Sequence, residues 1–254
     1  MIDAIFTHRS IRKFREDAIP EEVMNQLLMA GSRASTTGNM QVYSIIVSTE
    51  ADIKEALWKA HFRQNMVLQA PVVLTFCADF NRFNKWCRMR KAEPGYDNYL
   101  SFFTGAIDAL LAAQNVALEA VNQKLGICYL GTTTYNAGQI IDILGLPDSV
   151  VPVTTLVVGY PDENPPLTDR LPLRAIIHRE KYQKHTEQEI NEIYSERENS
   201  ALTRELLEIN QKETLAQIFT DKRYTKTDNE SFSKAFLQTI AKQGFLKNID
   251  KPFE

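Results

Sequence analysis

The sequence has little of the residues from which metal sites, disulfide frameworks and covalent active sites are built. Its 254 residues include 3 cysteines and 4 histidines. Cys77, Cys87 and Cys128 are odd in number and lack C-x-x-C spacing, and the histidines lie far apart. This pattern favours reduced thiols in a cytoplasmic protein, and we expect no structural metal.

The motifs of common nucleotide and nucleophile chemistry are also missing. There is no Walker P-loop, no G-x-G-x-x-G after a strand and no G-x-S-x-G turn. No close pair of carboxylates marks a glycosidase-like site. A reaction carried out by a bound cofactor needs neither a protein nucleophile nor a metal, so the inventory favours that kind of chemistry.

Charge and hydropathy do not indicate a nucleic-acid or membrane partner. The net charge of −3 lacks the basic excess of a general nucleic-acid binder. No uninterrupted apolar run reaches the roughly 18 residues that span a bilayer, and we expect no secretion signal. A hydrophobic fraction of 44% suits a soluble globular protein, and 254 residues suit one large domain or a domain with an appendage.

Apolar periodicity predicts alternating helices and strands over the first two thirds of the chain. A helix from Phe103 to about Leu125 is apolar on nearly every side, which predicts burial in the core or against another subunit. We expect Gly126 to end it through a positive φ. Further helices are expected at residues 20–34, 52–60 and 137–144, and strands at 43–48, 72–77, 127–131 and 150–160.

The composition changes after about residue 181. The following part is polar and charged, with helical patterns at residues 187–210 and 229–243. Its apolar positions are too few for an independent core. We therefore expect a core formed by residues 1–182 and a C-terminal helical excursion, residues 183–254, that packs on the core or on a partner subunit.

Several polar segments are candidates for binding. Residues 8–12 read His-Arg-Ser-Ile-Arg, an order that suits phosphate but also fits a solvated surface run. Residues 31–41 form a small-residue loop that is either a binding loop or a connector. The proline-rich stretch 161–172 must run over the surface and place Arg170. Basic and aromatic residues alternate at 81–96, where we favour a lid or a subunit contact over nucleic-acid binding.

Five of these segments, in this order, resemble the nitroreductase superfamily: residues 8–14, 35–41, 76–79, 129–131 and 164–172. They are most similar to its NADPH-linked group of oxygen-insensitive nitroreductases and flavin reductases. The resemblance covers residues 1 to about 182 well and the rest loosely. It implies an α+β fold with a mostly antiparallel sheet flanked by helices, an intertwined homodimer, and one FMN in each of two interface sites.

The resemblance also implies roles for residues around FMN. His8, Arg9 and Ser10 would hold the phosphate, and Arg170 would join them. Arg12 would lie at the pyrimidine end, where a fixed positive charge stabilises the reduced ring. The Gly131 N–H would face flavin N5. The implied cofactor-binding residues are His8, Arg9, Ser10, Arg12, Thr36, Thr37, Asn39, Gln41, Gln64, Tyr129, Leu130, Gly131, Thr132, Thr168 and Arg170.

One position departs from the family pattern. A lysine often stands two residues before the loop arginine, but this chain has Thr168 there and Asp169 beside it. A lost charge-assisted hydrogen bond is worth roughly 1.5–3 kcal/mol. We therefore expect weaker FMN binding unless another cation compensates.

The implied reaction is a ping-pong oxidoreduction. Hydride passes from NADPH to FMN, and a nitroaromatic, quinone or flavin acceptor then receives two electrons, with no protein residue catalytic in its own right. The 2′-phosphate of NADPH would need cations, and the candidates are Arg197, Arg204, Lys222 and Arg223, unless these belong to a solvated face.

Other functions stay open on the sequence alone. The same scaffold could be a flavin reductase that releases reduced FMN, or a dehalogenating or ring-modifying flavoenzyme. It could also be a flavin-binding regulatory or interaction protein without turnover. The expected partners are a second copy of the chain and a small-molecule acceptor, with neither nucleic acid nor membrane.

Overall fold

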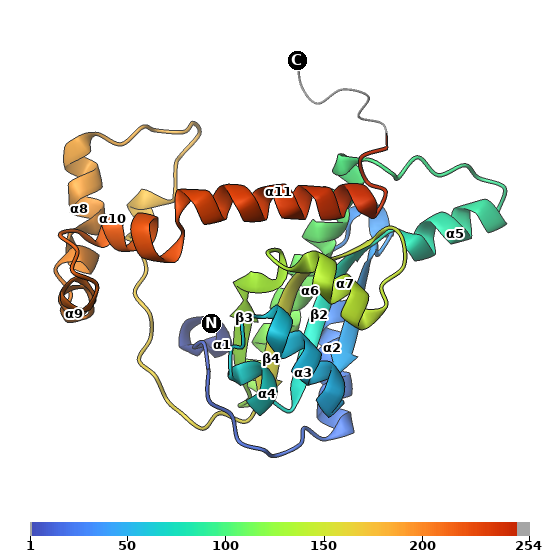
Figure 1. The fold of residues 1–254 in the computed structure, drawn as a ribbon, viewed down its shortest axis with the longest axis horizontal. Helices are drawn as coiled ribbons and strands as arrows, with labels where there is room; N and C mark the ends of the chain where they lie inside the picture. Colours follow the sequence, from blue (N-terminus) through green and yellow to red (C-terminus); the bar gives the residue numbers. More distant parts are fainter. Residues whose placement is uncertain (1, 248–254) are drawn as a thin grey trace. The chain divides into compact units, whose positions relative to one another are not determined.

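The computed structural model describes residues 2–247, which fall into two compact units. The first unit contains residues up to Pro166 together with the segment from Phe232 onward, and the second is Leu167–Ser231. Helix α11 (Lys226–Lys242) begins in the second unit and continues in the first (Figure 1).

The first unit is built on a four-stranded antiparallel sheet with the order β1-β2-β4-β3. Its strands are β1 (Tyr43–Ser48), β2 (Val72–Asp79), β3 (Gly126–Leu130) and β4 (Val150–Gly159). All four were predicted to within about two residues. Every residue of β2 is buried, because helices cover both faces of the sheet. The α+β fold with an antiparallel sheet is therefore confirmed.

One face of the sheet is covered by α6 (Tyr99–Asn122) and α2 (Glu21–Ser32). The buried face of α6 consists largely of alanine, which lets the helix lie close to β2 and β4. The helix begins four residues earlier than predicted, because the Asn98 side chain accepts a hydrogen bond from the Ser101 N–H at 3.0 Å and caps it.

The opposite face carries α3 (Ala51–Ala60), α4 (Met66–Gln69) and α7 (Ala137–Leu144). Ile11 and Phe14 of the N-terminal segment are buried in the same cluster. The short helix α1 (Asp3–Thr7) precedes that segment, and α5 (Asn81–Met89) follows β2. A third apolar cluster includes Phe80, Phe102 and Phe245.

The expectation that Gly126 ends α6 through a positive φ was wrong. Gly126 has no positive φ; Lys124, with φ 65°, makes the left-handed turn. Glycine is needed at 126 for space, since a Cβ there would lie 2.8 Å from Ile11 Cγ1.

By length and mean hydropathy, α6 is apolar enough to cross a bilayer. However, 56% of its most apolar window is buried within the chain, as in a core helix.

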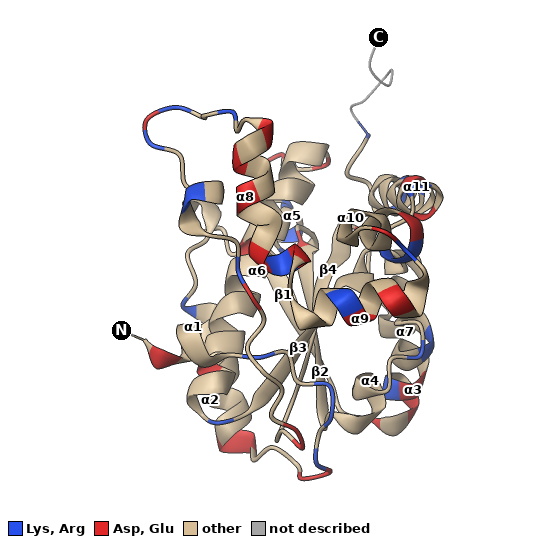
Figure 2. Cartoon of the chain, turned by 90° about the vertical axis from the view of Figure 1, so that its left-hand side faces the viewer, with Lys and Arg blue, Asp and Glu red and all other residues tan. Residues whose placement is uncertain are grey.

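The second unit is helical. It contains α8 (Glu187–Glu198), α9 (Ala201–Asn210) and α10 (Leu215–Ile218). The single helix predicted over residues 187–210 is broken because Ser200 caps a new helix, its hydroxyl accepting from the Thr203 N–H at 3.1 Å. Both α9 and α11 carry basic and acidic residues (Figure 2).

Candidate functional site

The N-terminal cationic segment is an extended strand-like stretch fixed to the end of the sheet. Its Ile11 N–H donates to the Ile127 carbonyl at 2.8 Å, and the Arg15 N–H donates to the Tyr160 carbonyl at 2.9 Å. Burial of Ile11 and Phe14 leaves Arg12 exposed between them. The register thus turns a cation outward next to the end of β3.

Glu163 holds the backbone of this segment from a point far along the chain. One carboxylate oxygen, Oε1, accepts from the Arg12 N–H at 2.5 Å and from the Lys13 N–H at 3.2 Å. The contact uses the backbone of both residues and leaves their charged side chains available. Sequence reasoning did not find Glu163, because no spacing connects residues about 150 positions apart.

The side chains of the cluster gather over β3. Burial raises the pKa of the Cys128 thiol, while the nearby Arg12 guanidinium and a hydrogen bond from Ser10 oppose that shift. The Nε of Arg9 is buried and has no partner within residues 2–247, and His8 Nδ1 lies 3.3 Å from the Ile5 carbonyl oxygen. A shielded, unpaired guanidinium N–H is a donor that an anion would satisfy.

The turn after β3 brings together two of the residues implied to bind the flavin. Gln64 Nε2 donates to Thr132 Oγ1 at 3.2 Å. His61, which was not predicted, approaches the same hydroxyl with Nδ1 at 2.8 Å. At Gly131 a Cβ would meet no atom within 4 Å, so a ligand can reach the backbone there. Tyr129 is partly exposed and Leu130 is buried.

The turn that carries Gln64 is strained and well anchored. Phe62 and Arg63 have φ of 53° and 57°, a left-handed conformation that costs on the order of 1 kcal/mol for each residue other than glycine. Gln64 Nε2 also donates to the His61 carbonyl at 3.1 Å. Burial lowers the pKa of His61 to about 4, so its ring is neutral near pH 7.

The small-residue loop is structured rather than a slack connector. Thr37–Asn39 forms one 3₁₀ turn, and Thr36 precedes it in an extended conformation. Asn39 and Gln41 both have left-handed φ, and Gln41 Nε2 donates to Asn39 Oδ1 at 3.2 Å. The exposed side chains of Thr37, Asn39 and Gln41 are available to a ligand.

Thr168 and Arg170 belong to the second unit, whereas the other residues implied to bind FMN belong to the first. Arg170 Nη1 donates to Thr168 Oγ1 at 2.6 Å and to the Asp169 carbonyl at 2.8 Å. The Asp169 carboxylate pairs with Arg197 at 2.5 Å. In this structure Arg170 therefore contacts its own loop, and its place at a phosphate stays a prediction.

The basic and aromatic stretch at residues 81–96 is partly core. Phe83 and Tyr96 have ring centroids 5.5 Å apart, and Tyr96 stacks on the buried Phe80 at 5.2 Å. These rings pack against one another, so they cannot serve as a platform for bases. Trp86, at 53% exposure, is the outward aromatic of α5.

The fold and these segments define a class of protein. One α+β unit carries the cationic segment of residues 8–12, the accessible backbone at Gly131, the small-residue loop of residues 31–41 and the turn with Gln64. All three cysteines are free and buried. This combination suits the binding of a phosphorylated cofactor. The chain belongs to the nitroreductase family, whose model matches residues 5–160. Family membership makes it an NAD(P)H-dependent oxidoreductase, as the sequence predicted.

Known proteins resemble the chain over most of its length. An NADPH-dependent oxidoreductase of Staphylococcus aureus is 34% identical over 224 residues, covering 83% of this chain and 85% of the relative. A protein from Bacteroides fragilis assigned as an oxidoreductase has a crystal structure with 51% identity and a TM-score of 0.95, covering 96% and 100%. The NADPH:FMN oxidoreductase of Vibrio harveyi, complexed with NAD⁺, has 27% identity and a TM-score of 0.80, covering 97% and 99%.

Proposed function

We propose that the protein is an FMN-dependent oxidoreductase that uses NADPH to reduce nitroaromatics, quinones or flavins by a ping-pong reaction. When bound, FMN would supply two-electron chemistry, taking hydride from a nicotinamide and passing it to the second substrate. The observation that carries the proposal is the cationic segment beside β3, where the buried Nε of Arg9 has no partner in the part of the chain that the structure describes.

The N-terminal residues would bind the phosphate. Arg9 offers the unpaired Nε, and His8 and Ser10 add donors on either side of it. A guanidinium binds phosphate through a planar fork of N–H groups, which a lysine cannot reproduce. By the family resemblance, Arg170 and Thr168 would also contact the phosphate.

Arg12 would hold a positive charge at the pyrimidine end of the ring. Reduction of a flavin puts negative charge on that end, so a fixed cation favours the reduced form. Glu163 accepts a hydrogen bond from the backbone N–H of Arg12, so the Arg12 guanidinium stays available to contact the flavin ring. In this arrangement the residue tunes the cofactor and takes no proton.

The remaining predicted residues would surround the ring and the ribityl chain. Gly131 gives open access to its backbone N–H, and Tyr129, Leu130 and Thr132 flank it. Gln64, already bonded to Thr132, faces the same turn. The loop residues Thr36, Thr37, Asn39 and Gln41 would supply hydroxyl and amide contacts.

A second copy of the chain would complete the enzyme. The outer face of α6 carries apolar side chains at helical spacing that are exposed, among them Leu100 at 72%, Phe103 at 51% and Leu110 at 47%. A contiguous apolar stripe of this kind marks an interaction surface. We propose that it packs in a homodimer.

The colour of the purified protein tests the function. We expect a yellow preparation with oxidised-flavin absorption that bleaches anaerobically on addition of NADPH and recovers with nitrofurazone, a quinone or free FMN. A protein that binds flavin but is not bleached by NADPH or NADH is a regulatory or interaction protein instead. A colourless protein that takes up no added FMN contradicts the proposal.

The choice of NADPH over NADH would depend on cations in the second unit. Arg197 is already paired with Asp169. Arg204 donates to the Asn199 carbonyl at 3.2 Å, and the Arg223 guanidinium carbon lies 5.7 Å from the Phe219 ring centroid. We expect Arg204→Ala or Arg223→Ala to raise the KM for NADPH several-fold without changing that for NADH. If the ratio of the KM for NADPH to the KM for NADH does not change, the substituted residue does not bind the 2′-phosphate. Lys222 is then the next residue to test.

A further inference from the structure

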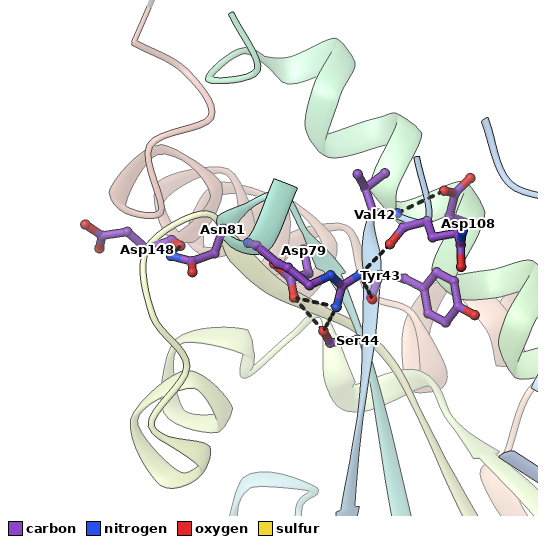
Figure 3. Close-up of polar contacts among 9 residues, drawn as sticks. Val42, Tyr43, Ser44, Asp79, Asn81, Asp108 and Asp148 are labelled. Carbon is purple, nitrogen blue, oxygen red and sulfur yellow. Dashed lines mark hydrogen bonds and ion pairs between the residues drawn. The ribbon is translucent and has the colours of Figure 1, made fainter. Parts of the chain in front are cut away.

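Asp108 is a charged residue on the largely apolar buried face of α6. Its side chain is fully buried and makes no ion pair in the described part of the chain. One oxygen accepts from the Thr37 N–H at 2.9 Å. The other accepts from the Val42 N–H at 3.4 Å (Figure 3). A carboxylate has acceptors only, so it can satisfy both amides at once.

These two amides bracket a loop that needs support to keep its shape. Between them, Gly38 and Asn39 both have φ of 56°, and Gln41 has φ of 55°. Left-handed residues other than glycine persist only where the surroundings hold them in place. Asp108 contacts both ends of this stretch and therefore fixes its span.

Arg82 contacts the same loop through its carbonyl groups. Its Nη2 donates to the Gln41 carbonyl at 2.6 Å and to the Tyr43 carbonyl at 3.3 Å. Asp79 orients the guanidinium at 3.9 Å and itself accepts from the Ser44 hydroxyl at 2.5 Å (Figure 3). The Arg82 side chain is 60% exposed, so water screens this contact and makes it weaker than that of Asp108.

We propose that Asp108 is a positioning residue that sets the shape of the loop of residues 36–42 before the cofactor binds, and that Arg82 makes a second, weaker contact. The inference rests on the proposed function, in which side chains of this loop contact FMN. A site that is already in the binding geometry pays less ordering entropy when the ligand arrives. Loss of Asp108 should therefore weaken FMN binding although the residue does not touch FMN.

Asp108→Asn is the sharpest test, because it keeps the size of the side chain and one acceptor oxygen. Its NH₂ group would then face one of the two loop amides, placing a donor against a donor. In the full-length apo protein we expect hydrogen exchange at the Thr37 and Val42 amides to become at least tenfold faster. In titrations with FMN we expect the Kd to rise about tenfold, with a shifted visible absorption spectrum of the bound flavin.

Asn115→Ala is the matched control. Asn115 lies on the same helix, and its Nδ2 donates to the Ala30 carbonyl on α2 at 3.2 Å, away from the loop. We expect it to lower the Tm but leave loop exchange and the FMN Kd unchanged. Unchanged loop exchange in Asp108→Asn overturns the inference, and so does faster exchange with an FMN Kd equal to that of the control.

Arg82→Ala provides a second variant on an exposed side chain, which tests the loop even if Asp108→Asn does not fold. We expect a twofold to threefold increase both in loop exchange and in FMN Kd, and no change in either contradicts the inference. A wild-type protein that binds no FMN overturns the proposed function itself. The exchange measurement on the apo protein still separates that result from a failure of the Asp108 contact.

Discussion

Glu163 fixes the backbone of the N-terminal segment that we propose binds FMN. We expect Glu163→Ala to lower the free energy of unfolding by about 1–2 kcal/mol, since two backbone N–H groups lose their acceptor. FMN Kd should rise roughly threefold to tenfold, in proportion to the disorder introduced at Arg12. Equilibrium urea unfolding and FMN titration measure the two effects. Glu16→Ala, an exposed acid beside the same segment, should change neither.

His61 makes the stability of the fold depend on pH. Its pKa is lowered by burial from 6.5 in the unfolded chain to about 4 in the fold. Between these values the unfolded state binds the proton and the folded state does not, so acid favours unfolding. The contribution of His61 to the free energy of unfolding is about 3 kcal/mol at most. It is fully present above pH 6.5 and is lost as the pH falls toward 4.

We therefore expect the wild-type free energy of unfolding to fall more steeply between pH 6.5 and 4.5 than that of His61→Gln. The difference between the two proteins cancels the titration of the carboxylates they share. Urea unfolding at several pH values in this range measures it. Parallel pH profiles would show that His61 keeps its ordinary pKa in the fold.

The residues that sequence reasoning missed share a physical cause. Asp108, Glu163 and His61 act on backbone amides or on a hydroxyl from distant positions in the chain. Their partners depend on tertiary packing, which no local pattern encodes. The cationic residues of the N-terminal segment were predicted as a binding segment because their chemistry is visible in five consecutive positions.

At the scale of elements, the strands and helices with clear periodicity were predicted, but the positions of the helix ends were predicted less accurately. The β-branched runs of β1 and β4 identify strands because both elements lie in a buried sheet. The caps at Asn98 and Ser200 follow from Asn-x-x-Ser and Ser-x-x-Thr patterns that could have been read. The division into two units depends on packing, and only the structure gives its limits.

Packing of α6 on the sheet gives a prediction for a single methyl group. A Cβ at Gly105 would lie 3.0 Å from the Val42 carbonyl oxygen and 3.0 Å from Ala78 Cβ. Neither backbone can move easily, so we expect Gly105→Ala to destabilise the fold by about 1–3 kcal/mol despite alanine's helix propensity. Differential scanning calorimetry measures the change in Tm.

The same substitution has room in another helix. At Gly138 of α7 the nearest atom to a new Cβ is Thr239 Oγ1 at 3.6 Å, an ordinary contact. Gly138→Ala should therefore be neutral or stabilise the fold by up to about 1 kcal/mol. Equal losses of stability for the two variants would show that close packing at Gly105 is not the cause.

For the whole molecule, the exposed stripe on α6 predicts the oligomeric state. Leu110 belongs to this stripe, and the charge of Leu110→Asp would be buried twice in a symmetric dimer, once from each copy. Loss of apolar burial alone costs about 3 kcal/mol or more for the two sites together, enough to raise the dimer Kd more than a hundredfold. We expect sedimentation velocity to show a dimer for the wild type and a monomer for Leu110→Asp, which should also release FMN.

The control for this experiment lies on the other side of the sheet. Leu68 of α4 has a similar exposure, 41%, and α4 packs on the face opposite α6. Leu68→Asp should therefore remain dimeric, because its charge stays in water. If the wild type is a monomer that still binds FMN, the whole cofactor site lies on one chain. The exposed stripe on α6 then binds a partner other than a second copy. A dimer that survives Leu110→Asp would move the interface to a different surface, since a buried, unpaired carboxylate at its centre could not be tolerated.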